Sequence, residues 1–207
     1  MKHELQAIIS GKSQVKYGAI IQAATRYLSR SQSSSEVAQD HKHFKGEETK
    51  VLKKFITDNN LWIQDIDSKN FVSAGAEQKV YLKNSEKVIK LNDAIYYNSW
   101  KDYLNNLLLN NYFFADTAYE LIGFHENIEA LYAVIEQPFV KATEKTDLKN
   151  VKLFMSENGF LNKKNNDYYN PELGIILEDL HDENVLTVNG MLYFIDTVFY
   201  IDDKFYV

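Results

Sequence analysis

Apolar residues recur at helical spacing in four stretches of the chain, each of which can bury one face. The predicted helices cover residues 14–30, 47–59, 99–114 and 146–157. In the last of these, Thr146 is the expected N-cap, because its hydroxyl can accept a hydrogen bond from a free helical N–H group. Residues 29–35 are rich in serine and contain no apolar anchor. They are therefore predicted to form a loop or linker between the first two helices.

Short stretches rich in β-branched and aromatic residues lie between and after the later helices, and they indicate strands. The predicted strands cover residues 71–82, 87–91, 121–125, 130–137, 174–177, 185–188 and 192–195. Asn84-Ser85 is the expected turn between the first two, and Asn189-Gly190 is a strong hairpin signal between the last two.

The order of these elements predicts an α+β fold, with a small antiparallel sheet, helices and a terminal hairpin. We expect the two N-terminal helices to form an extension, residues 1–60, that packs on the rest of the protein. Residues 61–207 would then form the core as one compact unit.

Composition narrows the possible functions. The 207 residues include 45% hydrophobic residues, enough for an ordinary buried core, and no cysteine. Disulfides, thiolate zinc sites and cysteine nucleophiles are therefore excluded. The formal net charge of -6 argues against general nucleic-acid or anionic-membrane binding. Because no apolar run resembles a signal peptide or approaches the ~18 residues of a membrane span, we expect a cytoplasmic protein without a membrane partner.

Three polar residues near the C-terminus have the spacing of a phosphoryl-transfer site. Asp179 is followed by Asn184 five residues later, and Asp196 comes after the predicted hairpin. In kinases, the first Asp accepts the proton of the acceptor hydroxyl, and the Asn and second Asp hold Mg²⁺. Lys90, in Val88-Ile89-Lys90, has the place of the strand lysine that reaches the phosphates. Asp179, Asn184, Asp196 and Lys90 are thus the predicted catalytic residues, with Asn184 and Asp196 as metal ligands.

A nucleotide would need further contacts. Gly75 and Ala76 lie in the segment expected to cover the phosphates, whereas Glu136 and Gln137 end a strand and could form the hinge against adenine. There, backbone groups would supply the hydrogen bonds, so side-chain identity matters little. Together with Lys90, these are the predicted cofactor-binding residues. The expected cofactors are ATP and Mg²⁺, and the expected partners are a nucleotide and an unknown protein or small-molecule acceptor.

The carboxylate that would pair with Lys90 is left open by the sequence. Kinases usually supply a Glu from a helix for this purpose. Asp102 is the only carboxylate within the predicted helix 99–114, and Glu120, outside this helix, is a competitor.

The segments 75–82, 119–124 and 179–186, with Lys16-Tyr17-Gly18 and residues 47–50, carry a resemblance to a known family. The chain resembles the kinase-like domain of large bacterial "polyvalent" proteins found in phages and mobile elements. This resemblance covers most of the chain. It implies a minimal protein-kinase-like fold that lacks most of the C-terminal lobe, and serine, threonine or tyrosine kinase activity.

Several positions depart from an ordinary kinase. Gly75 is the only glycine kept in the phosphate-covering segment, and Thr197-Val198 follows Asp196 in place of Phe-Gly. The Asp-x-His run ending at His181 is closer to small-molecule phosphotransferases such as the aminoglycoside kinases. The activation loop and the peptide-binding lobe are not expected after Asp196. The first hypothesis is therefore an ATP-Mg²⁺ phosphotransferase. A pseudokinase that binds nucleotide or protein, and a purely structural partner-binding domain, are the alternatives.

Overall fold

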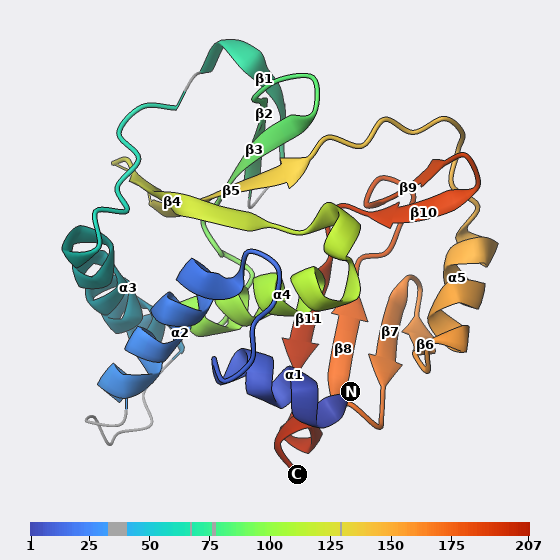
Figure 1. Ribbon diagram of the computed structural model, residues 1–207, viewed down its shortest axis with the longest axis horizontal. Helices are drawn as coiled ribbons and strands as arrows, with labels where there is room; N and C mark the ends of the chain where they lie inside the picture. Colours follow the sequence, from blue (N-terminus) through green and yellow to red (C-terminus); the bar gives the residue numbers. More distant parts are fainter. Residues whose placement is uncertain (33–40, 67, 76–77, 129) are drawn as a thin grey trace.

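A five-stranded antiparallel sheet forms the upper layer of the computed structural model, which describes residues 1–32, 41–66, 68–75, 78–128 and 130–207 (Figure 1). Its strand order is β1-β2-β3-β5-β4. The strands are β1 (Phe71–Ala74), β2 (Gln78–Leu82), β3 (Lys87–Asn92), β4 (Glu120–Glu126) and β5 (Leu131–Pro138). β5 is the most buried of them, because β3 and β4 pair with its two edges.

Helices pack below this sheet, and α4 lies in the middle of the molecule (Figure 1). The helices are α1 (Lys2–Ile9), α2 (Gly18–Gln32), α3 (His41–Asp58), α4 (Trp100–Phe113) and α5 (Leu148–Glu157). Ten of the fourteen residues of α4 are buried, since α1, α2, α3 and the C-terminal strand Val198–Ile201 all contact it. Three short 3₁₀ helices complete the set: η1 (Ser68–Asn70), η2 (Ala115–Thr117) and η3 (Asp203–Tyr206).

Two further antiparallel sheets form the C-terminal part. The four-stranded sheet has the order β11-β8-β7-β6, and β9 and β10 form a separate hairpin. Their bounds are β6 (Leu161–Lys164), β7 (Asp167–Asn170), β8 (Ile175–Glu178), β9 (Val185–Val188), β10 (Met191–Phe194) and β11 (Val198–Ile201). Asn189 and Gly190 join β9 to β10 with φ of 50° and 78°, the conformation that a tight hairpin turn needs.

One hydrophobic core joins the N-terminal helices to the rest of the chain. Leu5, Ile21 and Leu52, from α1, α2 and α3, belong to the same buried cluster as Leu107 of α4 and Phe199 of β11. All five are exposed by 1% or less. The first sixty residues are therefore anchored by the same apolar burial that holds the sheets together.

The α+β class, the antiparallel pairing and the N-terminal helices are confirmed, with corrections at several ends. α2 continues to Gln32, into the predicted loop, and residues 33–35 lie outside the described part. The predicted strand 71–82 is a hairpin of β1 and β2. α5 begins at Leu148 with Asp147 as its N-cap, because Asp147 accepts from the Lys149 N–H at 2.9 Å. The Thr146 hydroxyl instead donates to the Val185 carbonyl at 2.7 Å.

Among the described α-helices and strands, four were not predicted: α1, β6, β7 and β11. α1 has eight residues, of which three are buried, so its apolar pattern covers too few residues to indicate a helix. Every residue of β6 is exposed, and no apolar alternation marks it. β11 forms by pairing with β8, about twenty residues earlier in the chain, so its partner is not visible in the local pattern.

The start of α4 contains a buried acid. Glu48 of α3 is 3% exposed, and its Oε2 accepts a hydrogen bond from the Trp100 N–H at 2.6 Å. Burial raises the pKa of Glu48 to about 7, outweighing this hydrogen bond, which lowers it. The native state therefore holds a proton that the unfolded chain releases above pH 4.5.

We expect this proton to make stability depend on pH. Between pH 4.5 and 7 the native state binds more protons than the unfolded state, so the contribution of Glu48 to the free energy of unfolding falls as pH rises. Relative to Glu48→Gln, the wild type should lose up to about 3 kcal/mol between pH 5 and pH 8. Urea unfolding at both pH values measures this. Glu47→Gln, at an exposed neighbouring position, should show no such change, and a pH-independent Glu48→Gln effect would contradict the assignment.

Candidate active site

A cavity of about 430 Å³ lies between the first three strands of the five-stranded sheet and the chain around β9 and β10. We call it the sheet cavity. Five of the predicted site residues line it: Gly75, Lys90, Gln137, Asn184 and Asp196. Apolar side chains from both sides form its walls, including Val72, Val80, Val88, Phe139 and Leu186. The fold thus brings together polar groups separated by more than a hundred residues and surrounds them with apolar surface.

Lys90 reaches the sheet cavity from β3. Its side chain is only 5% exposed, and its Nζ donates to the Ile195 carbonyl at 2.8 Å. The same Nζ lies 3.7 Å from Asp196 Oδ2. The Tyr119 hydroxyl donates to the same Ile195 carbonyl at 3.1 Å. Burial, and then the charge of Asp196, raise the pKa of Tyr119 well above its ordinary value, so this hydroxyl keeps its proton as a donor.

Asp196 is held from two sides. Gln78 of β2 donates its side-chain N–H to Asp196 Oδ2 across the cavity. Beyond Asp196, the Thr197 hydroxyl donates to Asn110 Oδ1 at 2.8 Å, and the Phe199 N–H donates to Asn106 Oδ1 at 2.9 Å. Asn106 and Asn110 are one turn apart on α4, so this helix fixes the segment that carries Asp196.

The sequence reasoning missed Gln78, Asn106 and Asn110 as residues that position the site. A signal for the asparagines was present: α4 contains Asn105, Asn106, Asn110 and Asn111, and all four are buried. Asn is a poor residue for a helix interior because its side chain competes for backbone hydrogen bonds. A buried helix with several such residues therefore indicates side chains that bind other segments. Gln78 had no comparable signal.

Asp179 lies beside the sheet cavity rather than in its lining. Asn184 Nδ2 donates to Asp179 Oδ2 at 2.9 Å and to the Asp179 carbonyl at 2.9 Å. His181 Nε2 is 3.3 Å from Asp179 Oδ1. The Ile195 N–H donates to the Asn184 carbonyl at 2.9 Å, which joins this loop to the chain next to Asp196. Hydrogen bonds therefore link Asp179 to Asn184, and Asn184 to Ile195, the residue before Asp196.

The backbone of Asp179 has an unusual conformation. Its φ is 67°, in the left-handed region that few residues other than glycine adopt. Such a conformation costs roughly 1–2 kcal/mol, and Asp tolerates it better than most residues. Left-handed non-glycine residues are concentrated at functional sites. The conformation of Asp179 thus supports a role for this loop beyond connecting β8 to β9.

Glu136 turns away from the sheet cavity. It contacts Lys83, and its Oε2 is 3.0 Å from Lys87 Nζ. Burial alone would raise the pKa of Glu136, but the hydrogen bonds from Lys83 and Lys87 hold it below the ordinary value. Residues 137–140 line the cavity instead, and the Gln137 side chain donates to the Thr117 carbonyl at 2.8 Å.

Three other residues were candidates for contacting the nucleotide or pairing with Lys90. Ala76 lies outside the described residues. Glu120 Oε2 is 3.6 Å from Lys87 Nζ, so this acid is placed on the outer side of β3. Asp102 lies in the first turn of α4, where its N–H binds the N-cap Ser99. Among the described residues, Asp196 is a carboxylate that lies next to Lys90.

The polar groups of the sheet cavity suit a metal ion whose remaining ligands are the phosphates of a bound nucleotide. Among the described residues, no group of three or more His, Cys, Asp or Glu is arranged to hold a metal ion. Asn184 and Asp196 line the same cavity and offer one amide and one carboxylate. No hydrogen bond in the described part of the chain is made to Asn184 Oδ1. This donor set fits Mg²⁺, which commonly takes one or two carboxylates together with substrate phosphates.

A strand lysine beside an aspartate, an adjoining Asp–Asn loop and an antiparallel sheet above a central helix define a kinase-like fold. A family of serine/threonine/tyrosine kinases found in polyvalent proteins matches residues 45–203. The match covers most of the 207 residues, and the chain belongs to this family. No significant match was found among curated proteins or among solved structures. None of the described helices has the length and apolar character needed to cross a membrane.

Proposed function

We propose that the chain is an ATP-Mg²⁺-dependent phosphotransferase whose nucleotide binds in the sheet cavity. The observation that carries this proposal is the convergence of Lys90, Asn184 and Asp196 on one cavity. A cavity of about 430 Å³ is within the range of small-molecule sites, which bury apolar rings and use a few polar groups for orientation. Membership of a kinase family supports phosphate transfer as the reaction.

Each polar residue then has a distinct role. Lys90 would exchange its contact with the Ile195 carbonyl for phosphate oxygens, to which an ammonium donates strong charge-assisted hydrogen bonds. Asn184 and Asp196 would hold Mg²⁺, which neutralises phosphate charge when bound. Asp179 would accept the proton of the acceptor hydroxyl while Asn184 and His181 keep its carboxylate in place. Catalysis would consist mainly of positioning and electrostatic stabilisation.

One observation favours the alternative of a pseudokinase that binds nucleotide or protein without turnover. The polar groups of the sheet cavity are engaged with each other: Gln78 contacts Asp196, and Lys90 contacts the Ile195 carbonyl. A nucleotide must displace these contacts. The phosphate-covering hairpin also has Gly75 as its one glycine. Several glycines are normally needed there, because they let the backbone approach the phosphates closely.

Calorimetry with ATP, with and without Mg²⁺, tests nucleotide binding. We expect Mg²⁺-dependent binding to the wild type and at least about tenfold weaker binding to Lys90→Ala, since one charge-assisted contact is worth that factor. Lys87→Ala is the matched control, because Lys87 lies on the same strand but contacts Glu120 and Glu136 outside the cavity.

The outcomes separate the hypotheses. Failure of the wild type to bind ATP-Mg²⁺ would overturn both the phosphotransferase and the nucleotide-binding pseudokinase. The pseudokinase would be favoured if the protein binds ATP-Mg²⁺ but transfers no phosphate. The acceptors to be tested are a broad panel of proteins and small molecules, the chain itself and water.

A further inference from the structure

A second hollow lies between α1, α2, the start of α4 and the C-terminal segment, and its volume is about 600 Å³. We call it the cationic groove. Its lining includes Ser10, Lys12, Arg26, Arg30, Lys101 and Tyr206. Among the described residues, it shares no lining residue with the sheet cavity. It is therefore a separate site on the molecule, and the proposed function does not use it.

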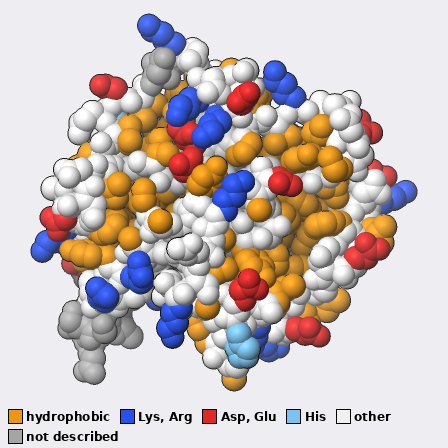
Figure 2. Space-filling model, viewed as in Figure 1, with side chains coloured by type: hydrophobic (Ala, Val, Ile, Leu, Met, Phe, Trp, Pro, Cys, Tyr) orange, Lys and Arg blue, Asp and Glu red, His pale blue; other side chains and the backbone are white. Residues whose placement is uncertain are grey.

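The charge of the cationic groove is opposite to that of the protein. Of the ten described residues that line it, four are Lys or Arg and none is Asp or Glu, although the chain has a formal net charge of -6. Figure 2 shows Lys and Arg side chains gathered over α2 on this face. In the described part of the chain, no ion pair is formed by Lys12, Arg26 or Lys101. Like charges that share a concave surface repel one another, and this repulsion favours the binding of an anion.

Local structure constrains the two arginines of the cationic groove. Arg26 and Arg30 are one turn apart on α2 and therefore lie on one side of the helix. Gly11 follows α1 with φ of 73°, and a Cβ added there would lie 3.0 Å from the Arg26 side chain. Arg26 Nη1 also donates to the Gly11 carbonyl at 3.5 Å. The glycine turn thus lets the Arg26 side chain lie against the backbone, which limits its freedom.

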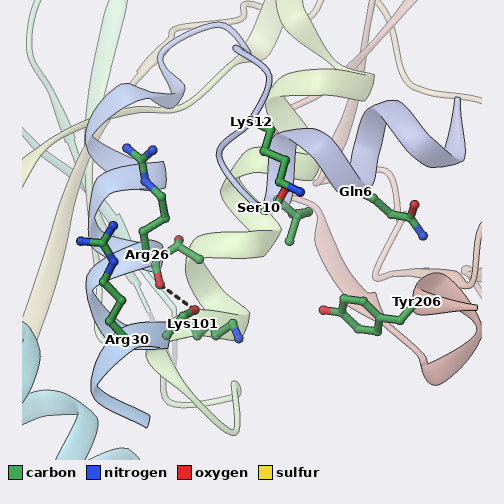
Figure 3. A pocket seen from close by; sticks show the side chains of 10 residues that line it. Gln6, Ser10, Lys12, Arg26, Arg30, Lys101 and Tyr206 are labelled. Carbon is green, nitrogen blue, oxygen red and sulfur yellow. Dashed lines mark hydrogen bonds between the residues drawn. The ribbon is translucent and has the colours of Figure 1, made fainter. Parts of the chain in front are cut away.

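The remaining groups complete a set of hydrogen-bond donors. In Figure 3 the ammonium ends of Lys12 and Lys101 and the Tyr206 hydroxyl face the open space between α2 and the C-terminal segment, while Arg26 and Arg30 stand along α2. Tyr206 is 64% exposed, and its hydroxyl can donate a hydrogen bond into the groove. Asp102 is adjacent to Lys101 in sequence but does not line the groove.

We propose that the cationic groove binds a small anion carrying several phosphate groups. Guanidinium groups match phosphate oxygens with pairs of parallel hydrogen bonds, and ammonium groups add compact charge. Figure 3 shows the guanidinium groups of Arg26 and Arg30 apart from the ends of Lys12 and Lys101, so several linked phosphates can contact more of these cations than a single phosphate can. A bound anion would also remove the repulsion among the cations.

The experiment uses inorganic tripolyphosphate as the probe and the full chain as the protein, with calorimetry at low and high salt. We expect binding to the wild type that weakens as KCl is raised, because salt screens exposed charges. The double variant Arg26→Gln/Lys101→Gln should weaken binding about tenfold or more, since charge-assisted contacts are lost. Lys149→Gln/Lys152→Gln, two exposed cations of α5 with the same total charge change, should bind as the wild type does.

Lys90→Ala distinguishes this groove from the sheet cavity, where phosphates are also expected. The part of tripolyphosphate binding that the double variant Arg26→Gln/Lys101→Gln removes should persist in Lys90→Ala. The proposal is overturned if the wild type does not bind the probe, if Lys90→Ala abolishes binding while the groove variant retains it, or if both double variants weaken binding equally. Thermal unfolding of each variant confirms that it is folded before binding is compared.

Discussion

Replacing Asp179 by Asn should reduce phosphate transfer by about 10²–10⁴-fold and leave the affinity for ATP nearly unchanged. Asp179 does not line the sheet cavity, so its loss removes no direct contact with the nucleotide. The carboxamide can still accept the hydrogen bond from Asn184, which keeps the loop in place. It cannot accept a proton from an acceptor hydroxyl, because an amide is far less basic than a carboxylate.

Transfer from labelled ATP and calorimetric ATP affinity, measured side by side, test this expectation. Asp182→Asn is a matched control in the same loop, since Asp182 is 3.5 Å from Lys145 and makes no contact with Asp179 among those described. Its transfer rate should equal that of the wild type. An Asp179→Asn protein that keeps full transfer would exclude Asp179 as the base, and one that loses ATP affinity equally would assign it to nucleotide binding.

Replacing Asp196 by Ala should remove both ATP-Mg²⁺ binding and transfer. Asp196 is the carboxylate assigned to the metal, and it lies 3.7 Å from Lys90 Nζ. Because Asp196 is the one charged group assigned to the metal, we expect ATP-Mg²⁺ affinity to fall about 100-fold or more, which corresponds to roughly 3 kcal/mol. Asp196→Asn keeps the shape and separates the loss of charge from any packing defect.

Magnesium alone gives a further test of the Asp196 assignment. One carboxylate and one amide are too few ligands for tight binding without phosphates, so titration of Mg²⁺ into the free protein should show no tight site. Tight binding in the absence of nucleotide would indicate a different metal site. Retention of ATP-Mg²⁺ affinity by both Asp196 variants would show that the metal is held elsewhere.

The sequence alone determined the α+β class and most of the secondary structure. Hydrophobic periodicity is local, so α4 and the β9–β10 hairpin were predicted nearly at their observed bounds. Spacing also identified Asp179, Asn184 and Asp196 as candidates, because the chain between them is a loop and a tight hairpin. Their roles stay predictions until the variants are measured.

Only the tertiary structure decided which side chains meet. It placed Asp196 beside Lys90, put Glu120 with Lys87 instead, and turned Glu136 away from the sheet cavity. It also assigned the asparagines of α4 to the segment after Asp196 and gathered Lys12, Arg26, Arg30 and Lys101 in one groove. A periodic pattern reports which face of an element is buried, but it carries no information about the distant residue against which that face packs. Partners separated by about a hundred residues are therefore set by the packing of α4 between the sheets, and not by any local signal.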